Sequence, residues 1–290
     1  MHPPVDTKDP TAVEVEVQGA YLTLFPEGDR LFVPLAFGWV IECFTGNYRD
    51  YQAVDARYHD LEHTLQGTLC MARLLLGRHR GGAPPAMTPR MFELGLLAIL
   101  LHDTGYLKKR ADTEGTGAKY TMTHVHRSAE FAARLLTDKG FTSSEITAVE
   151  NMIYCTGVDV DLSRIGFQSE LERITGFALA TADLLGQMAA ADYLEKLPIL
   201  YAEFAEAVRF SKTQKHFIAK FNSPEELMQN TPIFWKDFVK VRLDRELGGL
   251  FRFLSDPYPS GPNAYIERVE ANIERLKRLM AASSPGSVLA

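Results

Sequence analysis

Apolar residues recur at helical spacing through most of this chain, and a strand-like alternation is present only near its start. Residues 13–17 alternate between valine and glutamate, and the polar segment 26–29 separates two short apolar runs, which together predict a small β-hairpin. Beyond these runs the apolar positions follow the spacing of one helix face. Helices are predicted at residues 35–44, 59–76, 88–101, 127–137, 171–210 and 264–281. The predicted fold class is therefore mainly α, with a small N-terminal β-hairpin and an accessory C-terminal helical region.

Several predicted helices begin with a residue that can cap the backbone. Thr88 precedes Pro89, a typical N-cap followed by a first-turn proline, and Thr142 with Glu145 has the pattern of a capping box. Ser223–Pro224 and Thr231–Pro232 are predicted helix starts for the same reason. The last two lie in an aromatic-rich segment, residues 211–260, which we expect to cover the core or to close a substrate pocket.

The composition is that of a folded protein with a small acidic excess. Of 290 residues, 46% are hydrophobic, enough for a sizeable core, and the formal net charge is -6. This charge disfavours nucleic-acid polymers and anionic membranes, although a local basic pocket could still bind a nucleotide. The three cysteines form no Cys-x-x-Cys pair, and the longest strongly apolar run, residues 94–101, is too short to span a bilayer. We expect a cytoplasmic protein without an export signal or membrane anchor.

Five residues of metal-ligand type stand within or at the ends of predicted helices. They are His59, His63, His102, Asp103 and Asp183. The first two are four residues apart, so a helix would place both on one face. The adjacent His–Asp pair ends an apolar run, where a buried imidazole beside a buried carboxylate costs free energy unless a cation or hydrogen bonds compensate. The last aspartate follows another apolar stretch. Together the five residues predict one divalent-metal site.

The order of these residues resembles a known superfamily. The series His63, His102–Asp103 and Asp183 is similar to the HD-domain superfamily of metal-dependent phosphohydrolases, which takes its name from the His–Asp pair. Tyr58–His59 and Ala182–Asp183–Leu184 look most like the cyclic-nucleotide phosphodiesterase-like branch. The resemblance covers about residues 55–205 and implies an HD-domain helical bundle.

The resemblance also implies a role for each of these residues. The ligands implied for a first metal are His63, His102, Asp103 and Asp183. His59 would be an unligated general acid near the leaving group, and Asp103 would bridge to any second metal. His124 resembles the histidine that binds that second metal, and we prefer it to His126, which would face elsewhere on a helix. Asp60 or Glu62 is expected to orient His59.

The chain departs from the related branches at several positions. The phosphodiesterases carry another histidine soon after the His–Asp pair, where Thr104 and Gly105 stand here. The paired histidines of the cyclic-dinucleotide branch are missing, and no histidine lies between His126 and Asp183 to complete a diiron oxygenase site. The number of divalent metal ions per chain, one or two, is therefore left open. Nitrogen and oxygen ligands admit Mn, Fe, Zn, Co or Ni, with Mg at an oxygen-rich position.

Two further groups are candidates for substrate binding. Lys108, Lys109 and Arg110 follow the His–Asp pair and could neutralise a phosphate from a loop, or could be an ordinary solvated helix end. Gln187 lies one helical turn after Asp183 and could contact a base or support the site.

These observations favour a metal-dependent phosphoric ester hydrolase. The leading expectation is a phosphodiesterase that hydrolyses a nucleotide or cyclic-nucleotide ester with metal-activated water. The alternatives are a phosphomonoesterase or nucleotidase of the same superfamily, a non-catalytic nucleotide-sensing HD domain, and a diiron oxygenase. The expected partner is a small phosphorylated substrate, with no nucleic-acid polymer and no membrane, and a homo-oligomer stays open. The predicted divisions are an N-terminal extension (1–50), an HD core (51–210), accessory helices packed on the core (211–282) and a loose tail (283–290).

Overall fold

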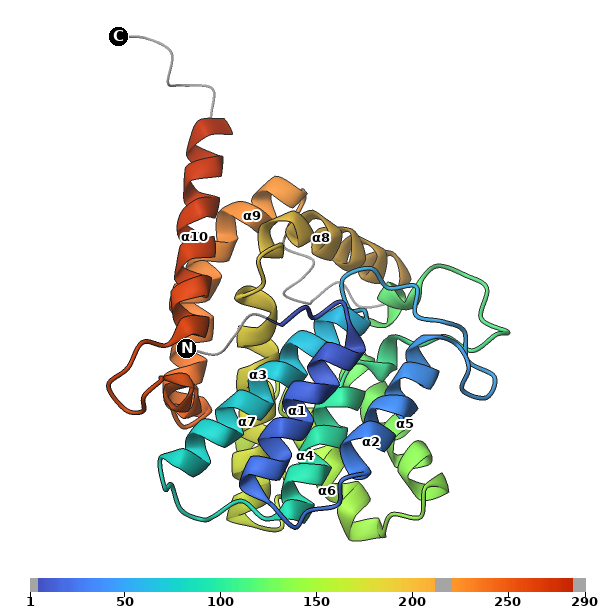
Figure 1. The fold of residues 1–290 in the computed structure, drawn as a ribbon. Helices are drawn as coiled ribbons and strands as arrows, with labels where there is room; N and C mark the ends of the chain where they lie inside the picture. The colour runs from blue at the N-terminus through green and yellow to red at the C-terminus, as the bar shows by residue number, and fades with distance from the viewer. Residues whose placement is uncertain (1–4, 212–220, 284–290) are drawn as a thin grey trace.

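Helices make up most of the chain, which the computed structural model describes at residues 5–211 and 221–283 (Figure 1). The α-helices are α1 (Pro10–Leu24), α2 (Phe32–Phe44), α3 (Leu61–Arg80), α4 (Pro89–Leu101), α5 (His124–Asp138), α6 (Ser143–Tyr154), α7 (Glu170–Met188), α8 (Tyr193–Phe210), α9 (Pro224–Ile233) and α10 (Ala264–Ser283). Shorter helical segments are η1 (Thr104–Tyr106), η2 (Gly117–Tyr120), η3 (Leu162–Arg164), η5 (Phe234–Val239), η6 (Arg242–Glu246) and η7 (Leu250–Leu254). Within the described ranges, β-structure is limited to isolated bridges. The prediction of a mainly α fold is confirmed.

The predicted N-terminal β-hairpin is wrong, because its first strands form helix α1. Asp9 caps this helix, and Pro10 occupies its first turn. The buried residues of α1 are Val13, Val17, Ala20, Tyr21 and Leu24. The valine–glutamate alternation at residues 13–17 fits a strand period, but Val13 and Val17 also share a helix face. The helical spacing continues to Leu24, and this longer pattern decides the structure.

Three of the four predicted helix starts are confirmed. Thr88 caps α4, Ser223 caps α9, and Thr142 forms the complete capping box with Glu145. The predicted start at Thr231–Pro232 is wrong, since both residues lie inside α9. The Thr231 hydroxyl donates to the carbonyl of Leu227 one turn earlier, so it continues the helix in place of capping a new one.

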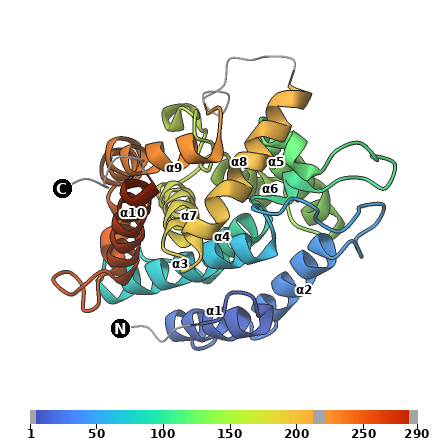
Figure 2. The ribbon, with the colours of Figure 1, turned by 90° about the horizontal axis from the view of Figure 1, so that it is seen from above.

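Helix α3 runs through the middle of the molecule and packs along α7, with α1 and α4 beside it (Figures 1 and 2). One glycine allows this close approach. A Cβ at Gly186 of α7 would lie 2.8 Å from the backbone of Gln66 in α3, so a side chain there would push the helices apart. A Cβ at Gly67 of α3 would lie 3.7 Å from the Cα of Asp183, which is an ordinary contact distance. The crossing therefore sets the first turns of α3 against the part of α7 that carries Asp183.

Residues 221–283 pack as helices against α7 and α8. The segments η5 and η6 are π-helical and bury Trp235, Val239 and Leu243 in the core, and α10 buries Val269 and Leu276. The predicted accessory region is thus mostly helical where the structure describes it, with a non-helical segment at residues 255–263. Residues 212–220 of that region and 284–290 of the predicted tail lie outside the described residues.

In the described part of the chain, no single helix has both the length and the apolar character to cross a bilayer. Helices α7 and α8 would meet that test only jointly, by length and composition, and they are bent by 110° at the break between them.

Candidate metal centre

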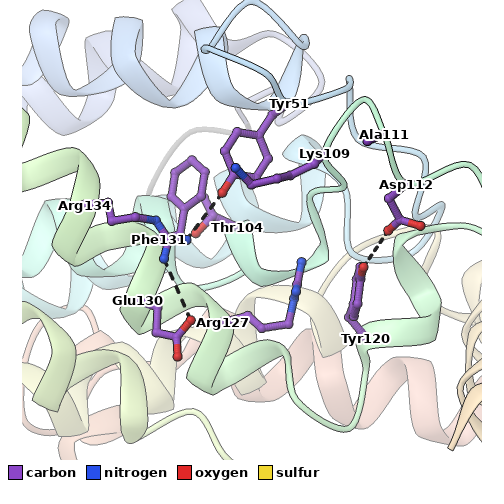
Figure 3. A pocket seen from close by; sticks show the side chains of 10 residues that line it. All are labelled: Tyr51, Thr104, Lys109, Ala111, Asp112, Tyr120, Arg127, Glu130, Phe131 and Arg134. Atoms are coloured by element: carbon purple, nitrogen blue, oxygen red, sulfur yellow. Dashed lines mark hydrogen bonds and ion pairs between the residues drawn. The ribbon is translucent and has the colours of Figure 1, made fainter.

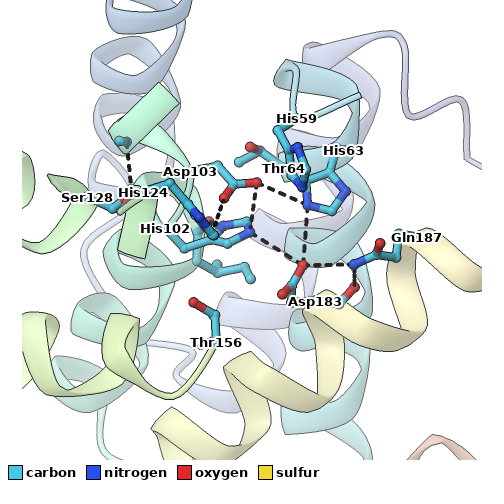
Figure 4. A network of polar contacts seen from close by, with 12 residues as sticks. His59, His63, Thr64, His102, Asp103, His124, Ser128, Thr156, Asp183 and Gln187 are labelled. Atoms are coloured by element: carbon cyan, nitrogen blue, oxygen red, sulfur yellow. Dashed lines mark hydrogen bonds and ion pairs between the residues drawn. The ribbon is translucent and has the colours of Figure 1, made fainter. Parts of the chain in front are cut away.

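The four residues predicted as ligands of one metal come from three helices and meet at one point (Figure 4). His63 lies in the first turn of α3, where its backbone N–H donates to the capping carboxylate of Asp60 at 2.9 Å. His102 and Asp103 directly follow the buried helix α4. Asp183 projects from α7 at the crossing with α3. Local capping and the α3–α7 approach together fix the position of the cluster.

The donor atoms of the cluster have the spacing of ligands around a common ion. His63 Nε2 lies 3.1 Å from Asp103 Oδ2 and 3.3 Å from Asp183 Oδ1. His102 Nε2 lies 3.3 Å and 3.5 Å from the same two oxygens. With metal–ligand bonds of about 2.0–2.2 Å, adjacent ligands of a tetrahedral or octahedral ion are separated by roughly 2.8–3.6 Å. The distances therefore fit a first-row divalent metal.

Hydrogen bonding at the cluster leaves metal-binding lone pairs directed inward. His102 Nδ1 lies 2.7 Å from the carbonyl oxygen of Ile99, which can only accept, so Nδ1 carries the proton. Its Nε2 then presents a lone pair to the cluster. His102 Nε2 and Asp103 Oδ2 are buried without a hydrogen bond. Buried polar atoms without partners are rare and costly, and a bound cation would satisfy both of these.

The four groups perturb one another strongly. Burial lowers the pKa of His63, but Asp103 and Asp183 outweigh it and raise that pKa to about 9. The pKa of His102 is raised well above its usual value by the same carboxylates, against the effect of burial. Burial raises the pKa of both carboxyl groups, yet the two imidazoles hold both pKa values below their usual range. Without metal, two protons supply the positive charge that a divalent ion would otherwise supply.

A second position for a metal adjoins the cluster at His124, the first residue of α5. His124 Nδ1 lies 2.6 Å from the carbonyl oxygen of Thr121, which leaves Nε2 as the lone-pair nitrogen, 3.8 Å from Asp103 Oδ1. Burial lowers the pKa of His124, so its imidazole is neutral and suited to a metal. His126 instead lies against the ring of Tyr154. The structure thus places His124 beside the carboxylate predicted to bridge two metals.

His59 lies beside the cluster but outside α3, which begins at Leu61. The prediction that one helix face carries both histidines is therefore wrong, although the His59 and His63 ring centroids are 5.4 Å apart. His59 stacks on Tyr106 with ring centroids 4.4 Å apart and planes inclined by 9°. This flat contact with a buried ring fixes the plane of the imidazole.

The partner that orients His59 is Glu203 of α8, not Asp60 or Glu62. Glu203 Oε2 lies 2.6 Å from His59 Nδ1, and Oε1 accepts from the backbone N–H of Tyr58 at 2.7 Å. Asp60 caps α3, and Glu62 forms an ion pair with Lys196.

Burial raises the pKa of Glu203, but His59 and the backbone N–H groups of Arg57 and Tyr58 outweigh it and hold that pKa below its usual value. Sequence reasoning missed Glu203 because it is 144 residues from His59.

The predicted substrate-binding residues have structural partners. Gln187 accepts from Tyr58 Oη at 2.8 Å and donates to the backbone carbonyl of Asp183 at 3.0 Å, so its amide supports the cluster. Lys108 is buried, with Nζ 2.9 Å from Asp55 Oδ2. The structure does not bring it to the cluster as a substrate-binding cation. Lys109 is exposed and forms an ion pair with Asp50 at 2.9 Å.

Comparison with known proteins places the chain in a family. A family model described as Npun_R2479-like matches residues 43–251, and the chain belongs to that family. No curated protein matches the chain. The matched range includes the metal cluster, His124, His59 and Glu203.

Proposed function

We propose that this member of the Npun_R2479-like family is a metal-dependent phosphohydrolase of the HD-domain type. The observation that carries the proposal is that the Nε2 atoms of His63 and His102 each lie 3.1–3.5 Å from a carboxylate oxygen of Asp103 and of Asp183. Beside them, a buried carboxylate holds His59 in one orientation. The residues that would hold the metal are His63, His102, Asp103 and Asp183. A divalent ion held there supplies Lewis-acid polarisation of a phosphoryl oxygen and activation of water.

His59 is the residue that would move a proton. Its Nδ1–H donates to the Glu203 carboxylate, so Nε2, on the opposite side of the ring, is the atom that gains and loses the catalytic proton. The carboxylate fixes the orientation of the imidazole, and the stacked ring of Tyr106 keeps it in place. A protonated His59 would donate to the leaving oxygen of a phosphoester, a contribution of about 10²–10⁴ in rate.

The substrate class within this proposal is a small phosphodiester, of which a nucleotide or cyclic nucleotide is the preferred example. Support comes from the placement of His59, which lies outside the group of His63, His102 and Asp103 and has Glu203 as its ion-pair partner. A nucleotide ester has a poor alkoxide leaving group, so its cleavage gains from a proton donor held next to the metal. A monoesterase of the same superfamily is the alternative.

The proposal is tested on purified full-length protein with bis(4-nitrophenyl) phosphate and 4-nitrophenyl phosphate as the diester and the monoester. Metal content per chain is measured on the same samples. We expect metal-dependent cleavage with preference for the diester. His59→Ala is assayed with a 3′,5′-cyclic nucleotide, whose leaving group is an alkoxide, and should lose cleavage of that ester with metal content unchanged.

A matched control is His126→Ala, which removes a nearby histidine that faces Tyr154. Cleavage of the monoester alone would shift the proposal to a phosphomonoesterase. Metal binding without cleavage of any of these esters would overturn hydrolysis, and full cleavage of the cyclic nucleotide by His59→Ala would remove His59 from the mechanism.

A further inference from the structure

A second site lies behind the turn that carries Asp103. A pocket of about 380 Å³ opens between α5 and the loop that follows η1 (Figure 3). Its walls present three cationic side chains and three aromatic rings, which are Lys109, Arg127, Arg134, Tyr51, Tyr120 and Phe131. None of the four clustered donor residues lines this pocket. The pocket is therefore separate from the metal centre, although Thr104, the residue after Asp103, forms part of its wall.

The positive charge of Arg127 is not matched by a carboxylate. Its Nε and one terminal nitrogen donate to the carbonyl oxygens of Gly105 and Leu107, at 2.7 Å and 3.0 Å. In the portion of the chain covered by the structure, no carboxylate lies within ion-pair distance of its guanidinium. The guanidinium carbon lies 3.4 Å from the centroid of the Tyr120 ring, so the planar group is stacked and held in place.

Arg134 and Lys109 add charge that can be redirected to a ligand. The contacts of Arg134 are long, 3.9 Å to Glu130 and 3.4 Å to the Tyr51 hydroxyl, and its side chain is 54% exposed. Lys109 pairs with Asp50 at the surface, where both side chains are more than half exposed. Exposed pairs of this kind exchange readily for another anion because water screens them.

The acidic residues of the pocket do not cancel this charge. Asp112 is already engaged, since its carboxylate pairs with Lys119 and accepts from the Tyr120 hydroxyl. Glu130 is exposed and approaches Arg134 only to 3.9 Å. The pocket therefore has three cationic side chains in its wall, whereas Glu130 is its one carboxylate without a close ion pair among the described residues.

We propose that this pocket binds a small phosphate-bearing anion and that its occupation alters metal affinity through η1. Arginine presents a planar fork that matches phosphate oxygens, and the lysine adds a point charge. Tyr51 and Tyr120 offer ring faces to a planar group attached to the phosphate. The volume lies within the range of small-molecule sites, about 300–1,000 Å³.

The coupling follows from the position of Arg127. A ligand that pairs with this guanidinium competes with its hydrogen bonds to Gly105 and Leu107, which hold the segment directly after Asp103. A Cβ at Gly105 would lie 2.0 Å from the His124 carbonyl oxygen, so this segment has almost no room to shift without moving His124. Binding in the pocket would therefore reach two residues of the metal centre. The same coupling must act in both directions.

The test uses inorganic phosphate and phenylphosphonate as probes, titrated into the full chain by calorimetry. Phenylphosphonate carries a phosphate-like dianion and a ring but no ester bond, so the measurement does not depend on hydrolysis. The pocket variant is Lys109→Gln with Arg134→Gln, which leaves Arg127 and the backbone of η1 intact. The matched control is Lys277→Gln with Arg278→Gln, which removes two exposed cations from α10.

We expect the pocket variant to weaken binding by about tenfold or more, with metal content unchanged, and the control to bind as the wild type does. Phenylphosphonate should change the dissociation constant of the metal by some factor. The metal should change the dissociation constant of phenylphosphonate by the same factor.

Absence of binding by the wild type at about 10 mM probe would overturn the site. Binding of equal strength by the pocket variant would also overturn the site. So would binding that is lost in His102→Ala and kept in the pocket variant, because the probe would then lie at the metal centre. A metal affinity unchanged by the bound probe would overturn the coupling.

Discussion

Replacing Asp103 by asparagine removes one negative charge from the metal cluster and keeps the shape of the side chain. Asp103 Oδ2 lies 3.1 Å from His63 Nε2 and 3.3 Å from His102 Nε2, and Oδ1 faces His124 at 3.8 Å. In the metal-free chain the change leaves two buried imidazolium groups with Asp183 as their one carboxylate in the cluster. Removing one member of a buried ion pair costs about 3–5 kcal/mol. The variant should be less stable than the wild type even without metal.

The effect on metal binding should be larger and can be measured separately. Even partners that only orient metal ligands contribute about 10–100-fold to affinity, so losing Asp103 itself should cost at least about 100-fold. A wild-type site with metal at about 1,000 times its dissociation constant gains about 4 kcal/mol of stability. For 290 residues the unfolding entropy is about 0.6 kcal/mol/K, so chelation should lower the Tm of the wild type by about 7 °C.

The assay is thermal unfolding of each protein with metal and after chelation, together with metal analysis. We expect the chelator to lower the Tm of the wild type and of Asp244→Asn, an exposed aspartate on η6. It should lower the Tm of Asp103→Asn by no more than about 2 °C, because a 100-fold weaker site at the same metal concentration still contributes about 1.4 kcal/mol. Because the comparison is made within each variant, general destabilisation does not produce this pattern. One tightly bound metal per chain in Asp103→Asn would refute the assignment of this carboxylate as a ligand.

Three other predictions follow from single contacts. Glu203→Gln should lower metal-dependent turnover about tenfold or more at unchanged metal content, because the carboxylate acts through His59, and steady-state kinetics with metal analysis checks this. Gly105→Ala should destabilise the chain by about 1–3 kcal/mol in urea denaturation, since the new Cβ would lie 2.0 Å from the His124 carbonyl oxygen. The raised pKa of His63 stabilises the metal-free fold fully below pH 6.5 and ceases to do so as pH rises through about 9. Metal must displace this proton and the one on His102, whose pKa is also raised, so competition titrations should show affinity rising about 100-fold per pH unit where both imidazoles are protonated, and a flat profile would contradict the charge arrangement.

The sequence was sufficient for features that depend on neighbouring residues. The caps at Thr88, Thr142 and Ser223 formed as predicted, because a side chain reaches its own helix end whatever the rest of the chain does. The prediction of a hairpin failed because the alternation at residues 13–17 is compatible with two periods. The helical spacing that continues to Leu24, and that is buried in α1, selects the helix.

By itself the sequence determined which residue types could form a metal site and that helices would carry them, because both follow from side-chain chemistry and short-range spacing. The tertiary structure decided which atoms meet. The α3–α7 crossing, which Gly186 permits, sets His63 against Asp183, and the packing of α8 places Glu203 beside His59. The tertiary structure also decided that Lys108 forms an ion pair with Asp55. Such pairings join residues far apart in the chain, and their energies depend on burial and on distances of a few ångströms that no local pattern encodes.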